Sequence, residues 1–241
     1  PETRALPDGI KADRPSAAHV IADRIDREGP IPLGDYMAIA NEHYYASKDP
    51  LGEEGDFVTA PEISQMFGEI IGIWLADLWL RKGSPDHCHY VELGPGRGTL
   101  AQDALRSLAK FGCTPTIHFV ETSPVLKAKQ ALLHPGAIWH DDIGSLPDDG
   151  PLLVVANEFF DALPIEQFVA TSGGWRRQMV ARDRSKFVAV ASAEVAEDRI
   201  GGSMSGFPDG TILERSPVSV ELAGHIANRL AKQGGTLLII D

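Results

Sequence analysis

The stretch His89-Tyr90-Val91-Glu92-Leu93-Gly94-Pro95-Gly96-Arg97-Gly98-Thr99 decides the fold of this chain. An apolar run that ends in a glycine-rich turn and continues into a helical pattern, Thr99 to about Lys110, indicates a strand, a tight turn and a helix. A second apolar run, Thr116-Ile117-His118-Phe119-Val120, ends on Glu121. This order of elements is the layout of a nucleoside-binding βαβ unit, so we predict a Rossmann-like α/β fold.

The glycine turn and the acid after the second strand have separate roles in holding a nucleoside. Gly94, Gly96 and Gly98 let the backbone bend sharply and approach a ligand closely. The helix that begins at Thr99 points its N-terminal amides at the ligand, which favours a negatively charged group. Glu121 is placed to accept hydrogen bonds from both ribose hydroxyls.

The spacing of the glycines separates two cofactor classes. The dinucleotide fingerprint is G-x-G-x-x-G, whereas the third glycine comes one residue early here. The G-x-G-x-G version, which includes Pro95, is usual in S-adenosylmethionine (SAM) methyltransferases. Glu92 fits this cofactor, because an acid two residues before the turn can orient the turn or bind the methionine ammonium. Asp142 follows a short third strand, 137–140, and we predict that it accepts a hydrogen bond from adenine; an ordinary acidic loop is the alternative.

A fourth apolar run, 152–156, is followed by Asn157, Glu158 and Asp161. Such a continuous run is typical of a parallel strand that is buried on both faces. Because ligands of these sheets bind beyond the carboxyl ends of the strands, we predict that these three residues are catalytic. The alternative is an asparagine N-cap followed by a helix with a solvated acid.

Three blocks of the sequence together resemble a known family. The blocks are 55–69 (GDFVTAPEISQMFGE), 91–99 (VELGPGRGT) and 156–164 (ANEFFDALP). They are similar to the MidA family of SAM-dependent methyltransferases, and the resemblance covers nearly the whole chain, most weakly between about Ala170 and Gly210. It implies SAM as the cofactor and an arginine of a protein as the substrate. For mitochondrial members it also implies a core subunit of respiratory complex I as the partner.

The resemblance also implies how an arginine would be held. Arginine methyltransferases generally place paired acids after the fourth strand, where carboxylates hold the guanidinium through bidentate hydrogen bonds. Glu158 and Asp161 occupy the equivalent region, although their spacing differs from the usual double-glutamate loop. Glu62 is the reserve candidate.

Thr59, Pro61 and Glu62 have two interpretations. The pattern Thr59-x-x-Glu62 is that of a capping box, with Pro61 in the first turn of a helix that runs to about Lys82. The functional interpretation makes the loop 56–64 a lid that folds over the cofactor, and it places all three residues at the cofactor site.

Composition narrows the range of partners. The chain has 241 residues and a net charge of −12, which disfavours nucleic acid and anionic lipid and suits a basic peptide substrate. Cys88 and Cys113 offer neither a disulfide framework nor metal-ligand spacing, so we expect no metal and a reducing compartment. The longest apolar run, 70–80, is too short to span a bilayer, so we expect no membrane insertion. We see no targeting segment and expect a bacterial cytoplasmic protein, or a mitochondrial matrix protein in a eukaryote.

The order of the patterns suggests four parts around one doubly wound, mostly parallel sheet. The final apolar run, 234–240, is typical of a buried fifth strand, and we expect the complete protein to continue with further strands. The parts are an N-terminal helical segment and lid (1–84), a SAM-binding core (85–165), an antiparallel hairpin insertion for substrate or partner (166–210), and a helix and strand that return to the core (211–241).

Three other functions remain open. A NAD-dependent oxidoreductase would need a third glycine one residue later and a histidine or tyrosine that handles hydride. A SAM-binding assembly factor without turnover would keep the glycine turn and Glu121 and would use the hairpins for docking. A small-molecule methyltransferase would share the same fold, because fold alone does not select a substrate.

Overall fold

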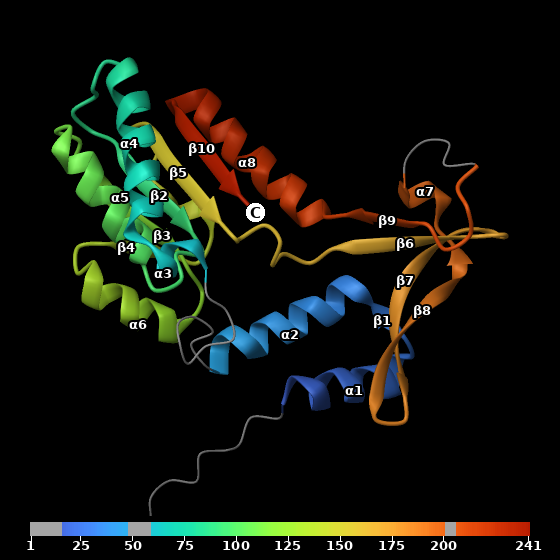
Figure 1. The fold of residues 1–241 in the computed structure, drawn as a ribbon. Coiled ribbons are helices and arrows are strands. Elements are labelled where there is room, and N and C mark those ends of the chain that lie inside the picture. The colour runs from blue at the N-terminus through green and yellow to red at the C-terminus, as the bar shows by residue number, and fades with distance from the viewer. Residues whose placement is uncertain (1–15, 48–58, 201–205) are drawn as a thin grey trace, which may run out of the picture.

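The computed structural model describes residues 16–47, 59–200 and 206–241, which form two β-sheets with helices packed on them (Figure 1). The larger lobe contains a parallel sheet in the order β10-β5-β2-β3-β4. Its strands are β2 (His89–Leu93), β3 (Thr116–Val120), β4 (Ile138–His140), β5 (Leu152–Asn157) and β10 (Gly235–Ile240). The chain starts in the centre at β2, builds outward to β4, and returns to β5 on the other side. The carboxyl ends of β2 and β5 therefore form the topological switch point, where such sheets bind ligands.

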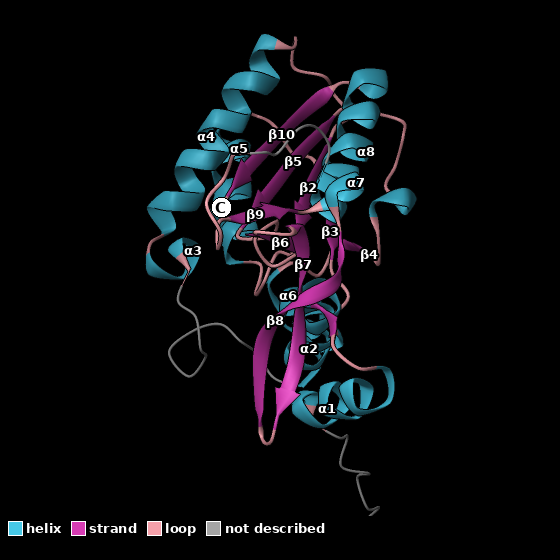
Figure 2. Cartoon of the chain, turned by 90° about the vertical axis from the view of Figure 1, so that its right-hand side faces the viewer, coloured by secondary structure: helices cyan, strands magenta, loops and turns pink. Residues whose placement is uncertain are grey.

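Helices cover both faces of this sheet, as the view in Figure 2 shows for α4 and α8. One face carries α4 (Gln65–Arg81), α5 (Thr99–Lys110) and α6 (Pro124–Leu133), and the other carries α8 (Pro217–Gln233). Neighbouring residues of β2 contribute to separate cores, since Tyr90 packs toward α4 and α5 while Val91 packs toward α8. Alternation of this kind explains why the whole strand is buried, its polar residues His89 and Glu92 included.

Two glycines bring α4 unusually close to α5. A Cβ built on Gly72 would lie 2.3 Å from the carbonyl oxygen of Ala104, and one built on Gly68 would lie 2.6 Å from the Cβ of Asp103. The pair therefore removes the side chains that would separate the helices, and it lets α4 lie directly over the helix that follows the glycine turn.

The smaller lobe is an antiparallel sheet in the order β1-β7-β6-β9, with β8 paired to β7. Ile21 and Ile25 of α1 and Ile31 of β1 are buried against Val180 of β7, and partly buried residues of α2 pack on the same cluster. Figure 1 shows α2 on the side toward which the arrows of the parallel strands point. The elements are α1 (Ala17–Glu28), β1 (Ile31–Pro32), α2 (Leu33–Ser47), β6 (Glu166–Thr171), β7 (Gly174–Asp183), β8 (Lys186–Val195), α7 (Glu197–Ile200) and β9 (Ile212–Arg215).

The predicted α/β class, the parallel strands and the hairpins are confirmed. The helix predicted to run to about Lys82 does end there, but the prediction of one continuous helix from a capping box at Thr59 is wrong. The structure has a short α3 (Ala60–Ile63), a break at Ser64, and then α4. Thr59 stands at the N-cap of α3 without a side-chain hydrogen bond, whereas the Ser64 hydroxyl accepts from Met66 N–H at 3.2 Å and caps α4. Among the described helices, none is both long and apolar enough to cross a bilayer.

Candidate cofactor and substrate site

The loops that follow β2 and β5 touch at the switch point. The backbone of Gly94 has φ +59°, and a Cβ at this position would lie 2.7 Å from Cδ2 of Phe159. The Gly94 N–H donates to the carbonyl of Val120 at 3.0 Å, which fixes the turn against the end of β3. Residues that are 65 positions apart in the sequence thus meet where the sheet topology predicts a ligand.

The glycine turn is held from behind by side chains of α6. Gly96 and Gly98 both have positive φ, and Gly98 is the N-cap of α5. Gln130 Nε2 donates to the Gly96 carbonyl at 2.7 Å, and His134 Nε2 lies 2.9 Å from the Gly98 carbonyl. Pro95 completes the turn by accepting the Gly98 N–H at 2.8 Å. The backbone shape needed to approach a ligand is therefore fixed by the chain itself.

Glu121 lies at the tip of β3 and belongs to the same network. Its side chain is buried and accepts from the Ser123 N–H at 2.8 Å and from Gln130 Nε2 at 3.2 Å. Burial raises the pKa of this carboxyl, and the hydrogen bonds from Ser123 and Gln130 oppose the rise. One buried amide therefore links the predicted ribose acid to the glycine turn.

Glu92 is the most deeply buried acid of the site. It is 2% exposed and accepts a hydrogen bond from the Tyr90 hydroxyl at 2.7 Å. Burial raises its pKa from 4.5 to about 8, against the lowering effect of the Tyr90 hydrogen bond. Within the described ranges no hydrogen bond joins Glu92 to the glycine turn, so no direct contact supports the prediction that Glu92 orients this turn.

Short helix α3 lies on the N-terminus of α5. The Thr99 hydroxyl donates to Glu62 at 2.7 Å, and Arg97 Nη1 lies 3.7 Å from the other oxygen of this carboxylate. The Glu62 carboxylate therefore interacts with Arg97 and Thr99 at the end of the glycine turn, and it does not form a capping box with Thr59. Pro61 is buried beside it. Of the predicted lid, residues 56–58 lie outside the described residues.

Asp142 begins the loop after β4. Its Oδ1 accepts the Gly144 N–H at 2.7 Å, which caps the short 3-10 helix η1 (Ile143–Ser145) and leaves the side chain exposed. Trp139 of β4 packs on Phe119 and donates its Nε1–H to Gln130 at 2.8 Å. Asp142 is thus available to a ligand, whereas Trp139 supports the network behind the turn.

The loop after β5 carries the predicted catalytic residues. Glu158 has φ +50°, an uncommon conformation for a residue with a side chain, and its N–H donates to the Ile240 carbonyl at 2.8 Å. Asn157 is the last residue of β5, and Glu158 and Asp161 are exposed. Among the described residues, neither carboxylate has a hydrogen-bond or ion-pair partner. Asn41 of α2 donates to the Ala162 carbonyl at 2.7 Å and ties this loop to the smaller lobe.

Sequence reasoning missed Gln130 and His134. Gln130 lies in α6 and His134 is the C-cap of that helix; both are buried, and the sequence around them shows no motif. A weak signal existed, because two polar residues four positions apart lie on the same face of a helix. Their role depends on tertiary contacts with the carbonyls of Gly96 and Gly98, which the local sequence does not indicate.

Comparisons with known proteins point to one family. A family model described as "Putative S-adenosyl-L-methionine-dependent methyltransferase" matches residues 70–241. The chain is 37% identical to the mitochondrial protein arginine methyltransferase NDUFAF7 homolog of Drosophila melanogaster, over 94% of this chain and 60% of that protein. It is 34% identical to mitochondrial NDUFAF7 of Homo sapiens, over 90% of this chain and 57% of that protein. The chain thus spans about three fifths of the length of these relatives.

Two solved structures of Burkholderia thailandensis proteins share the fold. The first has a TM-score of 0.69 and 26% identity, over 87% of this chain and 57% of that chain. The second, which is bound to S-adenosyl-homocysteine, has a TM-score of 0.70 and 24% identity, over 87% of this chain and 58% of that chain. The family match and the glycine spacing together disfavour the oxidoreductase alternative.

Proposed function

The chain belongs to this family of S-adenosyl-L-methionine-dependent methyltransferases, and from that premise we propose that it methylates an arginine of a protein substrate with SAM as the methyl donor. The observation that carries the proposal is the contact between the two loops at the switch point. It supports the proposal because Phe159, which packs on Gly94, belongs to the same loop as Glu158 and Asp161, two acids that have no partner among the described residues.

The residues around the glycine turn suit the parts of SAM. The N-terminus of α5, which begins at Thr99 directly after Gly98, suits the methionyl carboxylate. Glu121 suits the ribose hydroxyls, because its carboxylate is already oriented by Gln130. Asp142, exposed after the third strand of the unit, suits the amino group of adenine. This set explains why the turn and the two strand ends act as one site.

The bound cofactor supplies an electrophilic methyl group on a sulfonium. The chain's own contribution is to align the arginine nitrogen with that methyl and to exclude water from it. Glu158 and Asp161 would hold the other guanidinium nitrogens through charge-assisted hydrogen bonds. Such contacts draw positive charge away from the attacking nitrogen and leave its lone pair available. Asn157, at the end of β5, would position the same group from the strand.

The nature of the substrate follows from charge and from the relatives. An acidic chain attracts a basic peptide, and both relatives described above are named protein arginine methyltransferases. We therefore extend the proposal to a core subunit of respiratory complex I, as the resemblance to the MidA family implies. The relatives are named mitochondrial, and we propose the mitochondrial matrix as the working compartment, or the cytoplasm if the source is bacterial.

Calorimetry tests the cofactor half of the proposal. We expect the chain to bind S-adenosyl-homocysteine and not NAD. The variant Glu121→Gln should weaken this binding at least tenfold, because the ribose loses an ionised acceptor. Glu221→Gln, an exposed acid on α8, is the matched control and should bind normally. Absence of heat with S-adenosyl-homocysteine would overturn the assignment.

A methylation assay tests the catalytic half. The chain, SAM with a labelled methyl group and a purified complex I core subunit should yield label on an arginine, located by mass spectrometry. Label on another protein's arginine would keep the reaction and remove the complex I partner. Binding of S-adenosyl-homocysteine without label on any protein would favour an assembly factor without turnover.

A further inference from the structure

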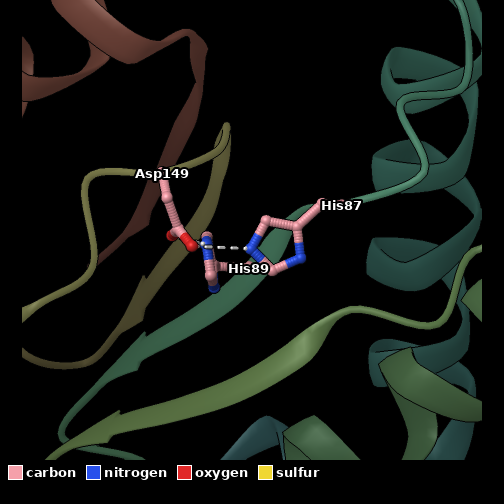
Figure 3. A group of neighbouring side chains, drawn as sticks. All are labelled: His87, His89 and Asp149. Carbon is pink, nitrogen blue, oxygen red and sulfur yellow. Dashed lines mark hydrogen bonds and ion pairs between the residues drawn. The ribbon is translucent and has the colours of Figure 1, made fainter.

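We propose that His87, His89 and Asp149 form a binding site for one divalent transition-metal ion at the amino-terminal edge of the parallel sheet (Figure 3). His89 is the first residue of β2, and Asp149 precedes β5. The cluster thus lies at the end of the strands opposite to the glycine turn. The proposal does not depend on the proposed function.

The three side chains converge in the geometry that a metal ion needs. Asp149 Oδ2 lies 3.2 Å from His87 Nε2, and Asp149 Oδ1 lies 3.0 Å from His89 Nε2. One ligand atom from each residue can be chosen so that all three lie within 4.8 Å of one another. Ligands that share one ion at about 2.0–2.2 Å lie roughly 3.0–3.5 Å apart. Small rotations of the exposed His87 and Asp149 side chains would close the remaining difference.

The donor set selects the class of metal. Two imidazole nitrogens and one carboxylate oxygen suit Zn²⁺, Co²⁺ or Ni²⁺, whereas Mg²⁺ and Ca²⁺ prefer oxygen ligands alone. Three protein ligands leave at least one position for water. The cysteine spacing gave no sign of such a site, because its ligands are a His-x-His pair and an acid that lies 60 residues away.

The loop that carries Asp149 is fixed in place by α8. Gln233 Nε2 donates to the Gly150 carbonyl at 2.7 Å, and Arg229 Nη2 donates to the Leu146 carbonyl at 2.7 Å. Gly150 also leaves room for the rings, since a Cβ there would lie 3.2 Å from His87 Cδ2. The carboxylate is therefore presented to the two imidazoles by a loop anchored on both sides.

Behind the cluster, a chain of buried imidazoles crosses the face of the sheet. His89 Nδ1 lies 3.1 Å from His118 Nε2, and His118 Nδ1 lies 2.9 Å from His140 Nε2. His140 Nδ1 lies 2.8 Å from the hydroxyl of Ser145, which can also donate to the Asp142 carbonyl at 3.3 Å. A histidine that binds a metal usually donates its other N–H to a fixed acceptor, and this chain supplies one.

The direction of these hydrogen bonds depends on whether a metal is bound. Without a metal, His89 donates its Nε2–H to Asp149, so its Nδ1 must accept from His118. His118 in turn accepts from His140, and His140 accepts from Ser145. A metal on His89 Nε2 moves the ring hydrogen to Nδ1, and every bond of the chain reverses. Ser145 then accepts from His140 and donates to the Asp142 carbonyl.

Zinc calorimetry on the whole, untagged, chelator-treated chain tests the site. We expect one Zn²⁺ per chain. His87→Ala and Asp149→Asn should each weaken binding at least tenfold. Both residues are exposed, so the variants should fold, which circular dichroism checks. His225→Ala and Asp148→Asn, which change an exposed histidine and the neighbouring acid, are the controls and should bind Zn²⁺ as the parent does.

Nitrogen NMR of the imidazoles gives a second, independent readout. Addition of Zn²⁺ should move the protonated ring nitrogen of His118 and His140 from Nε2 to Nδ1. Absence of stoichiometric binding, or equal affinity in His87→Ala and its control, would overturn the proposal. Binding without the tautomer change would mean an adventitious ion only. None of these results bears on SAM binding, so the methyltransferase proposal is tested separately.

Discussion

The turn after β2 and the loop after β5 lie in contact, yet the chain satisfies their polar groups very differently. In the turn, the carbonyls of Gly96 and Gly98 form hydrogen bonds with the side chains of Gln130 and His134. The Thr99 hydroxyl donates to Glu62. In the loop, Glu158 and Asp161 have no side-chain partner among the described residues, and Glu158 holds a left-handed backbone. The protein itself thus satisfies the polar groups of the turn that we propose for the cofactor, whereas the acids of the loop that we propose for the substrate have no partner among the described residues.

The left-handed backbone at Glu158 costs free energy, and this strain suggests a functional role for the loop after β5. A left-handed residue with a side chain costs on the order of 1–2 kcal/mol, and it persists only where the surroundings enforce it. Here the Glu158 N–H is held by the Ile240 carbonyl, and Phe159 packs on Gly94. The strained residue thus directly precedes Phe159, the residue that packs on the glycine turn. For this reason we expect the loop after β5 to contact the substrate, and the hydrogen bonds of the glycine turn to keep that turn in shape for the cofactor.

The largest effect should come from Glu158→Gln. Loss of the charge removes the clamp on the guanidinium, so we expect methyl transfer to fall by roughly 10²-fold or more. Affinity for S-adenosyl-homocysteine should change less than twofold. Single-turnover kinetics and calorimetry measure the two quantities. Glu194→Gln, an exposed acid on β8, is the control. Unchanged turnover in Glu158→Gln would remove this residue from the mechanism and break the comparison.

A smaller effect, on stability, should follow Gln130→Leu on the other side. The substitution leaves the Trp139 N–H, the Gly96 carbonyl and one oxygen of Glu121 without their partner. Buried groups of this kind cost about 1–3 kcal/mol each, and we expect a total loss of about 2–4 kcal/mol. Urea unfolding measures it.

The control for Gln130 is Gln102→Leu, which changes an exposed residue of α5 and should alter stability by less than about 0.5 kcal/mol. Equal stability of the two variants would show that the turn does not need support from α6. Weaker binding of S-adenosyl-homocysteine by Gln130→Leu should accompany its lower stability.

The contact between the two loops can be tested with Gly94→Ala. Its matched control is Gly112→Ala, because both glycines have positive φ but only Gly94 has a neighbour, Phe159, within 4 Å. Each variant should lose about 1 kcal/mol from backbone strain. Gly94→Ala should lose roughly 1 kcal/mol more and bind S-adenosyl-homocysteine about tenfold more weakly. Identical unfolding curves and affinities in the two variants would argue against the contact.

The difference between the loops also marks how far the sequence could predict the site. Strands and turn were predictable because buried parallel strands are continuously apolar and glycines occur where φ is positive. The break at Ser64 was not predicted, and neither was the use of Glu62, which binds Thr99, 37 residues away, and not the helix cap. Strand β9 was also not predicted, because its pairing partner β6 is distant in the sequence. Local patterns gave the elements, and tertiary contacts decided how polar side chains were used.

The last expected effect is a slope and not a fixed loss: Glu92→Gln, in β2 two residues before the glycine turn, should change the pH dependence of stability. The pKa of Glu92 is about 8 in the folded chain and 4.5 in its ordinary state, so between these values the folded protein retains a proton that the unfolded chain has released. Stability must therefore fall as the pH rises through this window, by up to about 1.4 kcal/mol per unit. Glutamine stays neutral and still accepts from Tyr90, so the variant should lose this slope. Urea unfolding at several pH values between 5 and 8 measures it, with Glu42→Gln as the exposed control. Parallel slopes in Glu92→Gln and the parent would mean that Glu92 is ionised in the folded protein, and that its burial does not raise its pKa.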